Sequence, residues 1–248
     1  MNKLVLVTSL VALGTTAAHA EDKKWSGEGE LGYTTSSTAA NTESSSLIAK
    51  LGINYKSGAW GNQLKVENVR TKTTSAPTLI APAGITSKTA DRSTLTDKLT
   101  YDINETVYSF ANGRYEDDEF SAYHYQKNLT LGLGWHVVKN DSTKLDLELG
   151  AGGQEDKLRS TGKKNSGAAG RFFEDFSHKI SETTDFTQSL LVEGNSDNAQ
   201  STFDAGLKVA INGSLALKLS HQVKHNSKVP AGTKNYSRIS SATLVYGF

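Results

Sequence analysis

The chain has 248 residues, with 27 basic and 26 acidic side chains and no cysteine. The balanced charge argues against a nucleic-acid-binding protein, which would carry a basic excess. The lack of cysteine excludes disulfides, thiolate catalysis and cysteine-bound metals. The length suits one or two soluble domains, or a single all-β barrel.

The first segment of the chain has the features of an export signal. Lys3 provides a positive charge, residues 4–13 form a mostly apolar core, and residues 18–20 (AHA) form a small-residue cleavage pattern. This arrangement predicts a secretory signal peptide over residues 1–20, which is too short to span a membrane as a helix. No apolar run in residues 21–248 approaches the roughly 20 residues that a membrane helix needs. The exported chain is therefore either soluble or a barrel that crosses a membrane with strands.

Behind the signal, apolar and polar residues alternate in one segment after another. A period of two indicates strands, and a membrane barrel shows it in segments of about 10 residues. In the sixth segment Leu129, Leu131 and Leu133 alternate with polar or small residues. The eighth segment carries aromatic residues on both sides, so its facing stays open. Twelve segments follow the pattern: residues 25–35, 43–56, 60–71, 94–101, 106–115, 121–137, 144–151, 168–180, 186–193, 203–211, 215–224 and 236–248.

The connections between these segments also indicate a barrel. Odd-numbered connections tend to be the longer ones, the third over about residues 72–92 and the seventh over about residues 152–167. An outer-membrane barrel has an even number of strands, short periplasmic turns and longer extracellular loops. We therefore predict an all-β fold, a closed antiparallel transmembrane β-barrel of about 12 strands, as a single domain over residues 21–248. The three prolines also fall in odd-numbered connections, where a missing backbone donor disrupts no strand pairing: Pro77, Pro82 and Pro230.

The last segment resembles the closing strand of a bacterial outer-membrane barrel. Leu244, Tyr246 and Phe248 fall on one side of it, opposite smaller and more polar residues. In such barrels a terminal aromatic strand is also the signal that the assembly machinery reads. We expect this strand to pair with residues 25–35, because closure removes sheet edges whose free backbone groups are costly in hydrocarbon.

We expect the apolar side of each strand to face lipid and the charged side to face the lumen. The lumen would then either be a narrow aqueous passage that selects ions or be closed by charges that pair across it. A soluble β-sandwich or lipocalin-like barrel, with the opposite facing, is the alternative. Four aromatic residues fit interfacial girdles: Tyr33, Tyr55, Trp60 and Trp135. The candidate lumen-lining residues carry both signs of charge: Glu28, Glu30, Lys50, Arg114, His124, Asp146, Glu148, Asp204, Lys208, Lys218 and Lys224.

Few residues suggest chemistry. His221 and His225 would share one face of a helix, but on a strand the same spacing holds them roughly 13 Å apart, too far to share a metal ion. Residues 116–119 are all acidic and suit either a Ca²⁺ or Mg²⁺ site or a solvated extracellular turn, and they lack the ordered spacing of an EF-hand. No GxSxG motif or comparable hydrolase signature is present. We therefore predict no enzymatic activity, no cofactor and no metal site.

Several motifs together resemble one protein family. The first motif is WSGEGELGYTTSS from residue 25, followed by NTES. Further along are NGRYEDDEFSAYHYQKNLTLGLGWHVV, EDFSHKISETTDFTQSL, SLALKLS and, at residues 243–248, TLVYGF. In these motifs the chain resembles a family of unknown function whose members are described as salt-induced outer-membrane proteins. The resemblance spans nearly the whole exported chain. It implies a barrel in the Gram-negative outer membrane and implies no mechanism.

These observations lead to two expectations of function. The first is a monomeric outer-membrane barrel that passes ions or small solutes passively, with a link to salt adaptation that comes only from the description of the family. The second is a closed structural barrel whose loops bind lipopolysaccharide or a surface partner. An outer-membrane hydrolase is the remaining alternative. In each case we expect contacts with outer-membrane lipid and lipopolysaccharide, insertion by the barrel assembly machinery, and no nucleic-acid partner.

Overall fold

Twelve strands make up the structure, a computed structural model that describes residues 24–37, 42–76, 78, 80–81, 84–229 and 235–248. The predicted signal peptide and the three prolines lie outside these residues. Within them, no helix is long and apolar enough to span a membrane. The strands are β1 (Trp25–Ser37), β2 (Glu43–Ser57), β3 (Trp60–Thr74), β4 (Thr86–Asp102), β5 (Val107–Asp118), β6 (Tyr123–Lys139), β7 (Thr143–Leu158), β8 (Lys164–Lys179), β9 (Thr184–Gly194), β10 (Ala199–Ala210), β11 (Leu215–Asn226) and β12 (Tyr236–Gly247).

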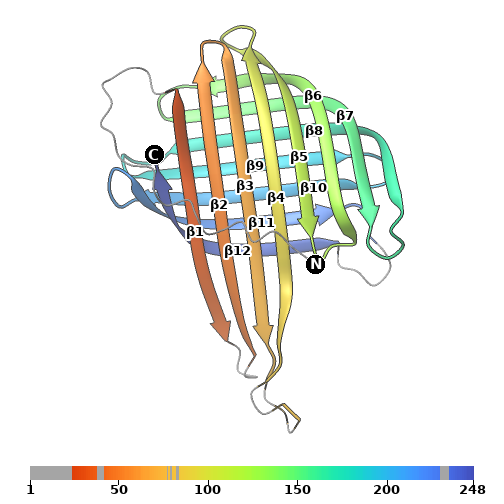
Figure 1. The fold of residues 1–248 in the computed structure, drawn as a ribbon. Helices are drawn as coiled ribbons and strands as arrows, with labels where there is room; N and C mark the ends of the chain where they lie inside the picture. Colours follow the sequence, from red (N-terminus) through yellow and green to blue (C-terminus); the bar gives the residue numbers. More distant parts are fainter. Residues whose placement is uncertain (1–23, 38–41, 77, 79, 82–83, 230–234) are drawn as a thin grey trace.

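The strands form one closed antiparallel barrel in which each pairs with its neighbours in the sequence. β12 pairs with β1 and closes the ring, with Leu244 opposite Leu31. At one end of this seam the backbones of Gly27 and Phe248 exchange hydrogen bonds of 2.9 and 3.0 Å. In Figure 1 the strands of the front wall cross those of the rear wall, as strands tilted against a barrel axis do. The predicted fold and the predicted partner of the closing strand are confirmed.

The two ends of the barrel differ in their connections. At one end, which we call the turn end, short turns span residues 58–59, 103–106, 140–142, 180–183 and 211–214. The opposite end, which we call the loop end, has the two longest connections, residues 75–85 and 227–235. There the β3–β4 hairpin projects beyond the rest of the barrel (Figure 1).

Two predicted boundaries are wrong. The seventh connection, predicted over about residues 152–167, is mostly strand, because β7 continues to Leu158 and β8 begins at Lys164. The fourth strand, predicted from residue 94, begins at Thr86. These extensions carry polar side chains on both faces. Without an apolar side a strand shows no alternation, so the pattern ends before the strand does.

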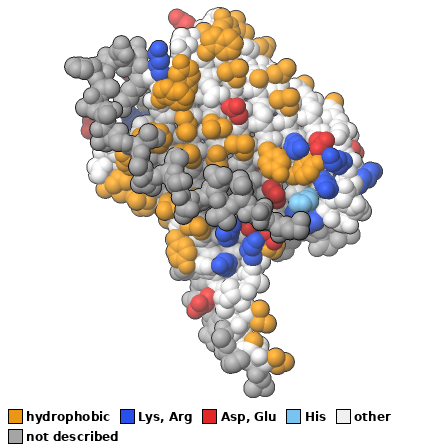
Figure 2. All heavy atoms as spheres, viewed as in Figure 1, with side chains coloured by type: hydrophobic (Ala, Val, Ile, Leu, Met, Phe, Trp, Pro, Cys, Tyr) orange, Lys and Arg blue, Asp and Glu red, His pale blue; other side chains and the backbone are white. Residues whose placement is uncertain are grey.

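The two faces of the barrel wall divide by polarity. Figure 2 shows hydrophobic side chains spread over the wall in view, with Lys and Arg side chains at the base of the projecting hairpin and toward the right-hand edge. This facing is the reverse of that in a soluble barrel, whose outer face would be polar. Large apolar side chains exposed on the outer face include Leu31, Tyr33, Leu129, Leu131, Leu149 and Leu244. Buried charged side chains of the inner face include Arg92, Arg114, Glu116, Glu148, Arg171 and Lys224.

The facing of β8, which the sequence pattern leaves open, is decided by its contacts. Arg171 is buried, and Phe173 and Asp175 line an interior cavity. The alternate residues Phe172 and Phe176 therefore face outward, paired with outward-facing residues of β7.

Two amide-to-carboxylate hydrogen bonds lie on the otherwise apolar outer face. Asn62 Nδ2 of β3 donates a hydrogen bond of 2.7 Å to Asp97 Oδ1 of β4. Gln188 Nε2 of β9 donates one of 3.1 Å to Glu174 Oε1 of β8. Each amide gives the neighbouring carboxylate a partner, which offsets part of the cost of a charge on an apolar surface.

Aromatic side chains of β5 fill one side of the interior. Tyr108 and Phe110 are only 3% and 4% exposed. They lie against Gly134 and Gly132 of β6, where an added Cβ would come within 2.1 Å of the Tyr108 ring and 2.8 Å of the Phe110 ring. The glycines that alternate with leucine in β6 therefore allow these rings to lie close to the wall. Open space remains beside β1–β4 and β8–β11, whose residues line the larger cavity.

Candidate functional site

Two interior cavities meet at a layer of charged side chains. The turn-end chamber, of about 490 Å³, is lined by residues near the turns, such as Glu28 and Asn54. The loop-end chamber, of about 410 Å³, is lined by residues near the loops, such as Phe120. Arg92 and Lys224 line both chambers. These two cations and their carboxylate partners, Glu67 and Glu116, form what we call the constriction.

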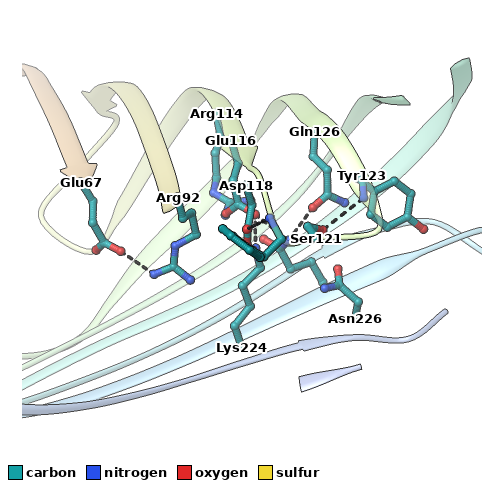
Figure 3. A network of polar contacts seen from close by, with 12 residues as sticks. Glu67, Arg92, Arg114, Glu116, Asp118, Ser121, Tyr123, Gln126, Lys224 and Asn226 are labelled. Atoms are coloured by element: carbon teal, nitrogen blue, oxygen red, sulfur yellow. Dashed lines mark hydrogen bonds and ion pairs between the residues drawn. The ribbon is translucent and has the colours of Figure 1, made fainter. Parts of the chain in front are cut away.

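Lys224 spans the full width of the lumen. Its ammonium bonds to the carboxylate of Glu116 and lies 3.9 Å from Asp118 Oδ2. β11, which carries Lys224, and β5, which carries Glu116, are six strands apart in either direction around the ring. The side chains of Lys224 and Glu116 are only 4% and 3% exposed. Figure 3 shows Lys224 reaching across from the opposite wall to the group around Glu116.

Arg92 makes the second contact across the lumen. Its Nη2 donates a hydrogen bond of 2.6 Å to Glu67 Oε1 on the adjacent β3 and one of 2.5 Å to Gln222 Oε1 on β11. The other carboxylate oxygen of Glu67 lies 3.3 Å from Lys50 Nζ. Gln222 in turn donates to Asp204 Oδ2 at 3.2 Å. Partners in two opposite walls therefore hold the guanidinium in place.

A chain of ion pairs continues from the constriction toward β7. Arg114 Nη2 lies 2.5 Å from Glu116 Oε2, and its Nη1 lies 3.6 Å from Glu193 Oε2. Arg171 donates hydrogen bonds to Glu193 Oε1 at 2.6 Å and to Glu148 Oε2 at 3.0 Å. Charges of opposite sign thus alternate along the chain, so each buried charge has a partner.

Glu148 forms the end of this chain and is its most buried member. Its side chain has no exposed surface. Besides Arg171, it accepts hydrogen bonds from Lys98 Nζ at 2.6 Å and from the Tyr108 hydroxyl at 2.9 Å. A carboxylate without solvent is tolerated only with several such donors.

Most of the candidate lumen residues point into the barrel. Lys208 Nζ lies 2.8 Å from Glu28 Oε1 near the turn end, and Asp146 Oδ1 lies 2.7 Å from His136 Nδ1. Glu148 belongs to the chain of ion pairs described above. The candidates that line the turn-end chamber are Glu28, Glu30, Lys50, Arg114, Asp204, Lys218 and Lys224.

His124 does not point into the lumen as predicted. The pairing of β6 with β7 shifts register between Tyr123 and Tyr125. Tyr123 takes the buried position, while His124 is exposed with its ring centroid 6.4 Å from that of Tyr125. A bulge inserts one extra residue, so an alternation counted through it assigns the wrong face.

The candidate girdle and closing-strand residues lie on the outer face. The Tyr55 ring centroid is 4.6 Å from that of Trp25, and the Trp60 centroid is 4.9 Å from that of Tyr101, which places two aromatic pairs near the turn end. Trp135 is partly exposed on β6. The remaining candidates are exposed: Tyr33, Leu244, Tyr246 and Phe248.

Several site residues were not predicted from the sequence. Arg92 falls in the predicted third connection, and Glu116 in the predicted acidic turn, yet both are buried inside the barrel. One signal was available, because Glu116 follows the lumen candidate Arg114 by two residues and so shares its face. The other unpredicted members lie in weakly patterned segments or at segment ends: Glu67, Lys98, Arg171 and Glu193.

The described residues offer little for catalysis or metal binding. They contain no group of three or more His, Asp or Glu side chains able to hold a metal ion. On the outer face His221 Nδ1 lies 2.8 Å from Ser240 Oγ. A hydrolytic pair also needs a group that orients the histidine and free donors for an oxyanion. No acidic or amide side chain of the described chain bonds to His221, and the two strands pair along this stretch. This pair alone does not make a hydrolytic site.

The chain is similar to several solved structures and matches one protein family. A search of curated proteins found no match. Among solved structures the chain is similar to an outer membrane channel from Pseudomonas putida F1 (12% identity, 90% of this chain and 94% of that chain, TM-score 0.49). It is also similar to the KdgM porin (9% identity, 90% of this chain and 99% of that chain, TM-score 0.47). A third similar structure is the translocator domain of the autotransporter NalP from Neisseria meningitidis (14% identity, 90% of this chain and 86% of that chain, TM-score 0.46). Residues 29–248 match the family described as "Protein of unknown function, DUF481", and because this match covers most of the chain, the protein belongs to that family.

Proposed function

We propose that the protein is an outer-membrane barrel whose lumen is a narrow, charge-lined passage for ions and small solutes. The observation that carries the proposal is the meeting of two interior chambers at a single layer of charged side chains. Because Arg92 and Lys224 line both chambers, displacement of these two side chains would join the chambers into one passage.

The barrel wall supports a membrane location. A closed barrel pairs its backbone groups from strand to strand, which is a requirement for any sheet in hydrocarbon. Its outer face is apolar and its inner face charged, as in outer-membrane barrels. With the predicted signal peptide and closing strand, these features support placement in the outer membrane, with the turn end toward the periplasm.

The passage would be small. Tyr108 and Phe110 fill one side of the interior, and cross-lumen contacts occupy the middle. Cationic and anionic side chains alternate along the network, so we expect only weak selectivity between anions and cations.

Single-channel recording in planar bilayers tests this proposal. Purified, refolded protein should give small, reproducible current steps. Heat-modifiable migration on a gel, which reports the folded barrel, is the control for each preparation. A bilayer that stays silent with protein shown to be folded contradicts the passage.

A closed structural barrel is the second candidate, favoured by the contact between Lys224 and Glu116 that spans the whole lumen. The projecting β3–β4 hairpin and the other connections of the loop end would then be the functional surface. They would bind lipopolysaccharide or a surface partner. A silent bilayer together with retention of the folded protein on immobilised lipopolysaccharide would favour this function.

The substitution Phe248→Asp is expected to reduce the amount of folded barrel in the outer membrane severalfold. The Phe248 ring lies over Gly27 at the seam, where an added Cβ would come within 2.3 Å of the ring. It also stacks near Tyr246, with centroids 6.4 Å apart. A carboxylate would remove these contacts and the terminal aromatic residue on which we expect assembly to depend. Cell fractionation with heat-modifiability gels measures the effect.

The matched control for this prediction is Phe120→Asp, which changes an exposed phenylalanine at the loop end, away from the seam. It should leave assembly near the level of the unchanged protein. Normal insertion of the Phe248→Asp variant would show that the closing strand does not depend on its terminal aromatic residue.

A further inference from the structure

Two charged side chains in the turn-end chamber have no bonding partner among the residues that the structure describes. Lys65 of β3 and Asp175 of β8 line this chamber. In the described part of the chain, neither takes part in a salt bridge or a side-chain hydrogen bond. Every other charged side chain that lines the chamber does, as Lys218 does with Glu30 at 2.7 Å. Lys65 and Asp175 therefore remain available to a solute.

These two side chains face the same space from distant walls. β3 and β8 are five strands apart by the shorter way around the ring. Both side chains keep exposed surface although they lie inside the barrel. No ion pair within 4.0 Å joins them, so a gap separates the two charges.

The surroundings of the gap suit a small polar solute. Gln63, whose Nε2 donates to Asn54 Oδ1 at 2.9 Å, precedes Lys65 on the inner face of β3. Thr187 and Ser189 of β9 line the same chamber. Hydroxyl and amide groups can bond a solute without adding net charge. The charges of Lys65 and Asp175 thus stand out as the groups that would orient a solute.

We propose that Lys65 and Asp175 form a binding site for a small zwitterion, such as a free amino acid. Its carboxylate would bind the Lys65 ammonium and its ammonium the Asp175 carboxylate, so both ends make charge-assisted hydrogen bonds. The chamber, at about 490 Å³, has room for such a solute. The inference rests on the proposed passage and names a solute class for it.

Solutes of similar size that differ in charge distinguish binding at this site from nonspecific binding to a polar lumen. Glycine carries both charges, acetate carries only the negative one, methylammonium carries only the positive one, and glycolamide is the uncharged isomer of glycine. Saturation-transfer NMR on the folded barrel in detergent measures their affinities. Glycine should bind about tenfold more tightly than acetate or methylammonium, the effect of one additional charge-assisted hydrogen bond. Glycolamide should bind most weakly.

Variants test the two residues individually. Lys65→Met and Asp175→Asn should each reduce the affinity for glycine about tenfold, to the level of the single-charge solutes. The double variant K65E/D175K exchanges the two charges and should restore the preference for glycine. Lys56→Met is the matched control, because it removes a lysine of β2 that pairs with Asp102 at 2.6 Å, and neither residue lines the chamber, so the glycine preference should not change.

The outcomes decide this site and the proposed passage separately. Equal affinity for glycine and acetate in the unchanged protein would overturn the site, and so would full preference in both single variants. A clear glycine preference in a protein that gives a silent bilayer would refute passage alone. Conduction without a glycine preference would refute the site alone. If Lys65→Met does not fold, the closer isostere Asp175→Asn decides the result.

Discussion

Replacing Arg92 and Lys224 together by alanine should raise the single-channel conductance severalfold. These are the two side chains that line both chambers, and their removal would join spaces of about 490 and 410 Å³. The fold should tolerate the change, because Glu67 keeps Lys50 and Glu116 keeps Arg114 as partners. Planar-bilayer recording of the folded variant beside the unchanged protein measures the increase.

The same variant should also shift ion selectivity. Loss of two cations leaves the constriction more negative, so the reversal potential in a KCl gradient should move toward cation selectivity. Lys208→Ala is the control, since it removes a lysine paired with Glu28 close to the turn end. Its conductance should stay close to that of the unchanged protein. If the double variant conducts like the unchanged protein, the narrowest point lies elsewhere. If neither protein gives current steps in the bilayer, the closed barrel is supported.

Glu148→Ala should destabilise the barrel by about 3–5 kcal/mol, the cost of leaving buried charges without a partner. Glu148 has no exposed surface and binds both Lys98 and Arg171. Arg171 would keep Glu193, but Lys98, only 16% exposed, would lose the one salt bridge recorded for it among the described residues. The Tyr108 hydroxyl would also lose its acceptor. Equilibrium unfolding by urea in lipid vesicles measures the difference.

Two further variants serve as comparisons for the stability of Glu148→Ala. Glu28→Ala breaks the pair with Lys208 in a region where the Glu28 side chain is 47% exposed, and should cost less than about 1 kcal/mol. Glu148→Gln keeps the size of the side chain and one carbonyl acceptor, so it should recover part of the loss. Equal free energies of unfolding for the Glu148→Ala and Glu28→Ala variants would mean that a buried ion pair of this network stabilises the barrel no more than an exposed one.

The charged lumen and the apolar wall have one common origin. A strand has only two faces, and in a membrane barrel the face toward lipid must be apolar. Charged side chains are then confined to the inner face, where the water content is limited and each charge requires a partner. The long ion-pair network is therefore an expected consequence of a narrow barrel with many inward-facing charges.

The sequence by itself determined the number of strands, the closure of the barrel and the facing of most strands. Alternation with a period of two ties polarity to a face, as Leu129, Leu131 and Leu133 show on β6. The alternation did not predict the structure where polarity no longer differs between the two faces of a strand. It ended early in β7 and β8, where both faces are polar, and it lost phase at His124, where a bulge adds a residue.

Only the tertiary structure decided which inward charges meet. Lys224 and Glu116 are 108 residues apart in the sequence, and Arg92 and Gln222 are 130 apart. Their heights in the lumen depend on the registers of all the strands between them, which no local pattern encodes. The same holds for the fit of Tyr108 against Gly134, which decides how much of the lumen stays open. The position of the constriction and the isolation of Lys65 and Asp175 are therefore properties of the closed ring, because they arise from contacts between walls that the chain order keeps far apart.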